Sequence, residues 1–130
     1  MPRYRTIQDA VAQFQKAFQR PTNLDFSRIK QDKKVAEVFD LRQKLIYEEC
    51  VELIQAMGEG KETEIKKEAA DLLYVLAGLF VDFCWDMQVI FNRIHQSNMS
   101  KLDENGKPFY RKDGKILKSN RYKKADLRGV

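Results

Sequence analysis

A helical pattern of apolar residues extends over residues 35–83 and is broken only at Gly58 and Gly60. Before the glycines, apolar residues recur mostly at steps of three and four, as on one face of an amphipathic helix. After the glycines, they cover more than one face, which indicates a helix at the centre of a bundle. The sequence therefore predicts an all-α helical bundle built around a central antiparallel helix pair, with a tight turn between the glycines.

Further elements are expected on both sides of this pair. Thr6 can cap a first helix that contains apolar residues at helical spacing and that Pro21 ends. A stretch from about residue 86 to residue 101 is either a fourth helix or a continuation of the third, since no proline or glycine separates the two. Beyond the turn signal Asn105-Gly106, residues 109–117 are typical of a short hairpin or an ordered arm.

The composition fits a single domain over residues 1–130, with 43% hydrophobic and 33% charged residues. Two cysteines cannot form a disulfide framework, and one histidine excludes a His-rich zinc site. No apolar run is long enough for a membrane helix, and the start does not read as a signal peptide, so a cytoplasmic protein is expected. Residues 101–130 carry ten Lys and Arg against four Asp and Glu, which makes residues 102–130 a basic arm.

Carboxylates stand inside the two central helices, among apolar neighbours where ordinary surface charges are unexpected. Glu49 and Glu52 are three residues apart, as are Glu68 and Asp71, so each pair projects from one side of its helix. If the chain folds back near Gly60, position i faces position 120 − i. Glu52 then faces Glu68, and Glu49 faces Asp71.

Four facing carboxylates repel one another unless a partner neutralises them. Oxygen ligands alone favour Mg²⁺ or Mn²⁺ over zinc or copper. The alternative is that the acids form ordinary ion pairs with Lys44, Lys66 or Lys67. A di-iron site is excluded, because it needs Glu-x-x-His pairs and His95 lies far along the chain.

This acidic pattern resembles the signature of the MazG-like all-α nucleoside triphosphate pyrophosphohydrolases. The motif reads Glu48, Glu49 and Glu52 on one helix, then Glu68 and Asp71 on the next. The later segments at residues 97–102, 106–108 and 113–115 also resemble small phage and mobile-element members of this family. The MazZ subgroup, which removes dGTP, is one such type.

The resemblance implies metal-dependent hydrolysis of a nucleoside triphosphate to the monophosphate, with release of pyrophosphate or of phosphates one by one. It implies that Glu49, Glu52, Glu68 and Asp71 hold Mg²⁺ or Mn²⁺. It also implies a catalytic role for Glu49 and for Glu48, which would bind another metal or orient the attacking water. A homodimer or homotetramer is expected, since one hairpin leaves much apolar surface uncovered.

Several other residues are candidates for holding the nucleotide. Lys101 and Arg93 could neutralise the outer phosphates and Asn98 could donate a hydrogen bond; the alternative for all three is a solvated helix end.

Asp82 could read the N1–H and N2 amine of guanine, which makes dGTP or GTP the leading substrate; its alternative is a capping or surface acid. Gln15 could contact base or sugar. Phe18 and Trp85 could stack on a base, although aromatic residues at helical spacing more often form a core.

A non-enzymatic helical module is the competing function, with the basic arm binding nucleic acid or a protein partner. No helix-turn-helix, zinc or RNA-binding signature supports specific nucleic-acid binding. Residues 119–130 can also be read as a solvated tail.

Overall fold

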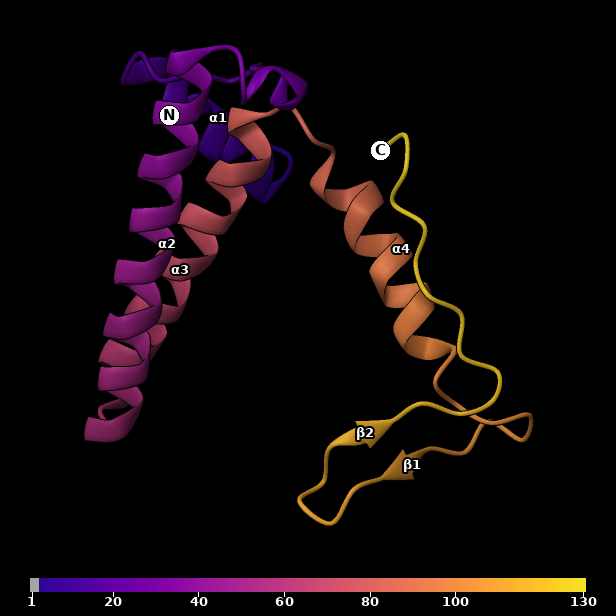
Figure 1. The fold of residues 1–130 in the computed structure, drawn as a ribbon. Helices are drawn as coiled ribbons and strands as arrows, with labels where there is room; N and C mark the ends of the chain where they lie inside the picture. The colour runs from indigo at the N-terminus through magenta and orange to yellow at the C-terminus, as the bar shows by residue number, and fades with distance from the viewer. Residues whose placement is uncertain (1–2) are drawn as a thin grey trace. The chain divides into compact units, whose positions relative to one another are not determined.

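The computed structural model describes residues 3–130 and divides the chain into two compact units, Met1–Trp85 and Asp86–Val130. The described residues form four α-helices, one short 3-10 helix and a two-stranded sheet (Figure 1). The all-α prediction is confirmed. The expected single domain contains the boundary between these units, and its extent stays a prediction. No single helix among these residues is long and apolar enough to cross a membrane; only α3 and α4 taken together meet that criterion, and a break separates them.

The first helix, α1, spans Ile7–Ala17 and begins as predicted. The Thr6 hydroxyl accepts a hydrogen bond from the backbone N–H of Asp9 at 3.0 Å, which satisfies one free donor of the first turn. The end was predicted wrongly, because the helix stops at Ala17 rather than continuing towards Pro21. Gln19 adopts a left-handed conformation with a φ of 57° and turns the chain before the proline is reached.

The central pair consists of α2, Lys33–Glu59, and α3, Glu62–Asp82. The two helices lie side by side and antiparallel, as predicted (Figure 1). Asp32 caps the start of α2 through its carboxylate. Gly60 ends α2 with a φ of 70°, a conformation that costs glycine little, whereas Gly58 remains inside the helix.

The core of the first unit lies where α1 packs on α3 and where the start of α2 lies beside the end of α3. The short 3-10 helix Phe26–Arg28 adds an aromatic ring to a cluster around Phe83 and Trp85, whose ring centroids are 5.2 Å apart. The buried apolar residues are Val11, Val35, Val38, Ala56, Ala77, Val81 and Phe83.

A buried polar network joins the three helices of this unit. Arg42 on α2 donates from Nε to Asp82 Oδ2 at 2.7 Å and from Nη2 to Asp82 Oδ1 at 3.0 Å. Gln15 on α1 donates to Asp82 Oδ1 at 2.9 Å and accepts from Arg42 Nη2 at 3.1 Å. The Asp82 side chain is 2% exposed, so the network satisfies a charge that could not otherwise be buried.

Gly78 makes room for this network, which leads to a first prediction. A Cβ at Gly78 would lie less than 3.0 Å from the Arg42 guanidinium, whereas a Cβ at Gly58 would meet nothing within 4 Å. We expect Gly78→Ala to lower the free energy of unfolding by about 1–3 kcal/mol, as overpacking does. Gly58→Ala should raise it by about 0.5–1 kcal/mol, because alanine favours a helix interior. Urea unfolding followed by circular dichroism measures both; equal shifts would contradict the close contact.

The second unit contains α4, Met87–Met99, and a hairpin of β1, Phe109–Tyr110, with β2, Ile116–Leu117. Of the two alternatives for the fourth helical stretch, a separate helix is correct. Cys84 has a φ of 55° after the end of α3, and the Asp86 carboxylate caps α4 by accepting from Val89 N–H. The predicted hairpin is confirmed as an antiparallel pair.

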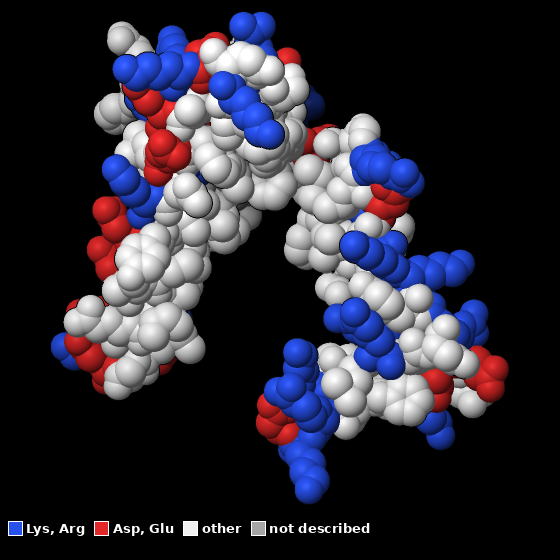
Figure 2. All heavy atoms as spheres, viewed as in Figure 1, with Lys and Arg blue, Asp and Glu red and all other residues white. Residues whose placement is uncertain are grey.

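Residues 119–130 run alongside α4 and are hydrogen-bonded to it. Arg93 Nη1 donates to the carbonyl of Asp126 at 2.9 Å, and Ser97 Oγ donates to the carbonyl of Lys123 at 2.7 Å. Lys123 N–H donates to Ser100 Oγ at 2.8 Å. Residues 119–130 are mostly exposed, as in a solvated tail, but these hydrogen bonds hold them along α4. Lys and Arg gather on the drawn face of the hairpin and its surroundings (Figure 2).

Candidate metal centre

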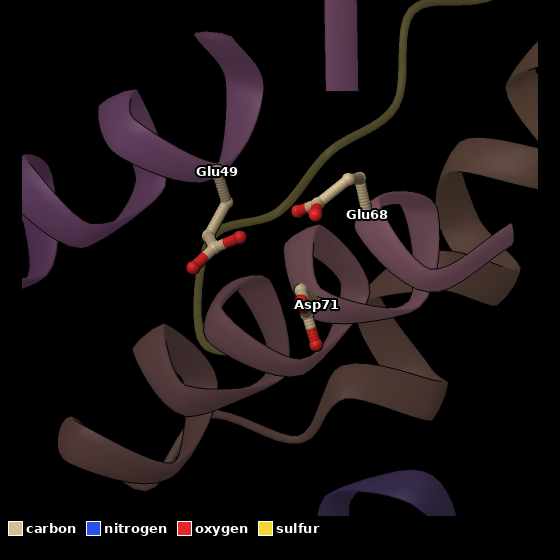
Figure 3. A group of neighbouring side chains, drawn as sticks. All are labelled: Glu49, Glu68 and Asp71. Carbon is tan, nitrogen blue, oxygen red and sulfur yellow. The ribbon is translucent and has the colours of Figure 1, made fainter. Parts of the chain in front are cut away.

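The antiparallel pair brings together three of the four predicted ligands. Glu49 on α2 offers an oxygen that lies within 4.8 Å of oxygens from both Glu68 and Asp71 on α3. Figure 3 shows Glu49 extending from its helix towards the helix that carries the other two. All three residues are half-buried. The turn at Gly60 thus places Glu49 near Asp71, as the sequence register predicted.

Glu52 and Glu48 lie beside this group in different ways. A hydrogen bond with Glu68 raises the pKa of Glu52, and repulsion from Glu49 raises it further. Glu52 is therefore close to Glu68, as the register predicted, although it is exposed and stands outside the three-residue group. Glu48 is also exposed and outside that group, so its catalytic role stays a prediction.

Two oxygens of the cluster are buried without a hydrogen-bond partner within the described part of the chain. They are Oε2 of Glu49 and Oε2 of Glu68. A buried carboxylate oxygen that gains no donor loses its hydration without compensation, which costs roughly 1–3 kcal/mol or more. Such atoms at the meeting point of three acids are what a cation site requires.

Lys67 supplies part of the missing positive charge. Its Nζ lies 2.8 Å from Asp71 Oδ2 and 3.4 Å from Glu68 Oε1, and the hydrogen bond to Asp71, followed by that to Glu68, raises the pKa of Lys67. The predicted lysine alternative is thus correct for Asp71 and for one oxygen of Glu68. The Lys67 side chain is 67% exposed and contacts neither unpartnered oxygen, so an exposed ion pair of this kind does not neutralise the whole cluster.

These residues fit a hard divalent cation. The donors are all carboxylate oxygens, which suit Mg²⁺, Mn²⁺ or Ca²⁺ rather than softer metals. The two helices of the central hairpin hold them. The remaining coordination positions would be open to water and to phosphate oxygens, as is usual for Mg²⁺.

A pocket of about 270 Å³ adjoins the cluster within the first unit. Leu45 lines it one turn before Glu49, and Tyr74 lines it about one turn after Asp71. Gln15 and Asp82 also line it, so two of the residues expected to contact the base lie in one cavity. The pocket is otherwise mostly apolar; its other lining residues are Val11, Phe14, Arg20, Val38, Leu41, Arg42 and Val75.

The other expected base contacts have different surroundings. Phe18 is 66% exposed and packs on Phe14, and Trp85 belongs to the aromatic cluster around Phe83. Neither lines the pocket. Asp82 is not the surface acid that the alternative proposed, because it is 1% exposed and both of its oxygens accept hydrogen bonds.

Arg42 is the residue that sequence reasoning missed. It lines the pocket, binds Asp82 and is 13% exposed. A signal was present: the register that pairs position i with 120 − i places Arg42 opposite Gly78. An arginine on an apolar face that meets a glycine has room to lie across the neighbouring helix, as observed.

The predicted phosphate-binding residues belong to the second unit. Arg93 and Asn98 are exposed on α4, and Lys101 is half-buried just after it. Arg93 already donates to the carbonyl of Asp126. Asn98 and Lys101 lie near the end of the helix, as expected. Their contact with substrate stays a prediction.

A pair of antiparallel helices that presents clustered carboxylates beside a pocket defines an all-α protein with a candidate divalent-metal centre. Residues 11–98 match the family model of phosphoribosyl-ATP pyrophosphohydrolase, and the chain therefore belongs to this family, within the MazG-like all-α NTP pyrophosphohydrolases. A comparison with curated proteins finds no match. Family membership makes the chain a pyrophosphohydrolase that acts on a nucleotide. Enzymes of this kind generally depend on a divalent metal.

Proposed function

We propose that the protein hydrolyses a nucleoside triphosphate to the monophosphate, with Mg²⁺ or Mn²⁺ held by Glu49, Glu52, Glu68 and Asp71. The observation that carries this proposal is the pair of buried, unpartnered oxygens of Glu49 and Glu68 beside Asp71. When bound, the cation neutralises phosphate charge and lowers the pKa of a coordinated water.

The chain's own residues divide the remaining work. Glu49, Glu68 and Asp71 would hold the cation on which the reacting phosphates are positioned, and positioning is most of what phosphoryl chemistry requires of a protein. Glu48, which is exposed directly before Glu49 on α2, orients the attacking water or binds another metal. Lys67 forms an ion pair with Asp71 at the edge of the cluster.

The leading substrate is a guanine nucleotide, dGTP or GTP. Its base would occupy the pocket and its phosphates would reach the carboxylates, because the two sites are about one helical turn apart on the same hairpin. This assignment agrees with the resemblance to small phage-type members and to the MazZ subgroup. The second candidate is phosphoribosyl-ATP, the nucleotide that the family's name specifies.

One assay panel tests this function. The purified protein is incubated with each (d)NTP and with phosphoribosyl-ATP, with Mg²⁺, Mn²⁺ or EDTA, and products are separated by chromatography with and without added pyrophosphatase. We expect metal-dependent formation of the monophosphate, greatest for a guanine nucleotide. No turnover of any nucleotide with either metal would contradict the proposal.

The contribution of Lys101 gives a second prediction. As a cation on the outer phosphates, it should lower the KM, so Lys101→Ala should raise the KM about ten- to a hundredfold, the value of one charge-assisted hydrogen bond. The base preference should not change, because a lysine on phosphate carries no base information. Steady-state kinetics with the preferred and one rejected nucleotide test both points; an unchanged KM would place Lys101 in solvent.

We also propose a homodimer or homotetramer. The central helices leave large apolar side chains exposed, which a second copy would cover: Tyr47, Val51, Ile54, Met57, Leu73 and Leu76. Light scattering after size-exclusion chromatography measures the mass; a monomer at micromolar concentration would contradict this proposal.

The proposal assigns no catalytic or recognition role to the basic arm, and it keeps the expectation of a cytoplasmic protein. Binding of the arm to DNA should be weak, independent of sequence and absent by physiological salt, because phosphate contacts alone are strongly screened. Tight, sequence-dependent binding without nucleotide hydrolysis would support the competing non-enzymatic module instead.

A further inference from the structure

The pocket beside the carboxylates contains one polar network whose hydrogen bonds can be followed donor by donor. Gln15 Nε2 has two N–H groups, which go to the carbonyl of Pro21 at 2.7 Å and to Asp82 Oδ1 at 2.9 Å. Arg42 Nε and both N–H groups of Nη2 are taken up by Asp82 and Gln15. These N–H groups are therefore already used in hydrogen bonds within the protein and are not free to bind a ligand.

Arg42 Nη1 is the exception within the described residues. It carries two N–H groups and makes one contact, to the carbonyl of Val75 at 3.5 Å. That distance is beyond the usual range for an N–H···O hydrogen bond. A guanidinium that is 13% exposed, lines a cavity and keeps at least one N–H without a good acceptor is suited to receive an acceptor from a ligand.

Asp82 is in the opposite situation. Its Oδ1 accepts from Gln15 and Arg42, and its Oδ2 accepts from Arg42. A base that presented two donors, such as N1–H and the N2 amine of guanine, would have to displace a buried ion pair. Breaking a buried pair costs several kcal/mol, more than two new hydrogen bonds return.

We propose that Arg42 is the specificity-determining residue of the pocket and that its Nη1 donates to the 6-oxo group of a purine base. This inference rests on the proposed function only in taking the pocket's occupant to be the nucleobase of a nucleotide. Guanine and hypoxanthine present an oxygen acceptor at position 6, whereas adenine presents an amino donor. Two donors that face each other leave both groups unpaired and reject the base.

The apolar walls support a base as the occupant. Phe14 and Tyr74 line the pocket with ring centroids 5.5 Å apart and an edge-to-face arrangement, and Leu41 and Leu45 line it from α2. Apolar walls with a few placed polar groups are typical of small-molecule sites. The carboxylates one turn away would hold the cation that binds the charged end of the same ligand.

Binding to the unmodified protein tests this inference without requiring turnover. The probes are non-hydrolysable α,β-imido triphosphates of guanine, hypoxanthine, adenine and 2,6-diaminopurine, titrated calorimetrically with Mg²⁺. If Arg42 reads the 6-oxo group, guanine and hypoxanthine should bind about equally and about ten- to a hundredfold more tightly than the other two. If the 2-amino group is read instead, guanine and diaminopurine should bind together, and the proposal is overturned.

Variants provide the second arm. Arg42→Lys keeps a cation for Asp82 but removes the guanidinium, so the preference for 6-oxo bases should fall at least tenfold. The matched control is Arg20→Gln, which removes the exposed arginine of the same pocket and should leave the preference unchanged. An unchanged preference in Arg42→Lys, a loss in Arg20→Gln, or no saturable binding of any probe would each overturn the proposal. Retained 6-oxo preference without hydrolysis would support it while the proposed function fails.

Discussion

Glu68→Gln should reduce kcat/KM by at least ~100-fold, because the substitution removes the charge of a proposed metal ligand in the acidic cluster. The same variant should be more stable than the unmodified protein when metal is removed with EDTA. The amide no longer repels Glu49 and Glu52. In the unmodified protein, Oε2 of Glu68 has no hydrogen-bond donor that would offset this repulsion. Metal-dependent turnover and thermal unfolding with EDTA measure the two effects.

The pH dependence of this gain in stability has a defined sign. The folded-state pKa of Glu52 is raised by its hydrogen bond with Glu68 and then by repulsion from Glu49. Because this carboxyl pKa is raised in the folded state, protonated Glu52 contributes to the free energy of unfolding at low pH. That contribution is lost as the pH rises through the folded-state pKa. The advantage of Glu68→Gln should therefore be greatest at neutral pH and should shrink on acidification.

Glu64→Gln is the matched control. Glu64 is exposed on the first turn of the same helix and does not belong to the acidic group. Its amide variant should retain full activity and should not gain stability. Full activity in Glu68→Gln, or equal loss in both variants, would be incompatible with a metal centre at this position.

Asp82→Asn should lower the free energy of unfolding by about 3–5 kcal/mol, because it leaves the Arg42 guanidinium buried beside a neutral amide. Typical domains have about 5–15 kcal/mol in total, so the variant should be largely unfolded at moderate urea concentration. Chemical denaturation of the metal-free protein, followed by circular dichroism, gives the value.

The exposed ion pair between Lys33 and Glu37 provides the comparison. Their side chains are 91% and 65% exposed, so Glu37→Gln should change the free energy of unfolding by no more than about 1 kcal/mol. A similarly small change for Asp82→Asn would mean that Arg42 escapes to water when its partner is neutral.

Much of this protein follows from its local sequence. Thr6 and Gly60 mark helix ends through hydrogen bonds and backbone angles that reach no further than a few residues, and the structure has helix ends at both. Residues 109–117 form the expected hairpin for the same reason. The register of the central helices also follows, since a short turn leaves an antiparallel pair little freedom to slide.

Contacts between distant segments were harder to foresee. The separation of α4 from α3 depends on Cys84, which adopts a left-handed φ that neither proline nor glycine announces. The packing of residues 119–130 on α4 depends on hydrogen bonds to serine and arginine side chains 23 to 33 residues away. No periodicity in the tail encodes those contacts.

The sequence by itself determined the all-α class, the helix hairpin and the carboxylates that it brings together, because each depends on spacing along one or two adjacent helices. Only the tertiary structure decided the state of those groups. It showed two carboxylate oxygens without partners, and Asp82 buried against Arg42 and Gln15 rather than exposed. The reason is that burial and pairing depend on three helices meeting at once. Polar side chains 27 to 67 residues apart carry no local signal of which partner they will find.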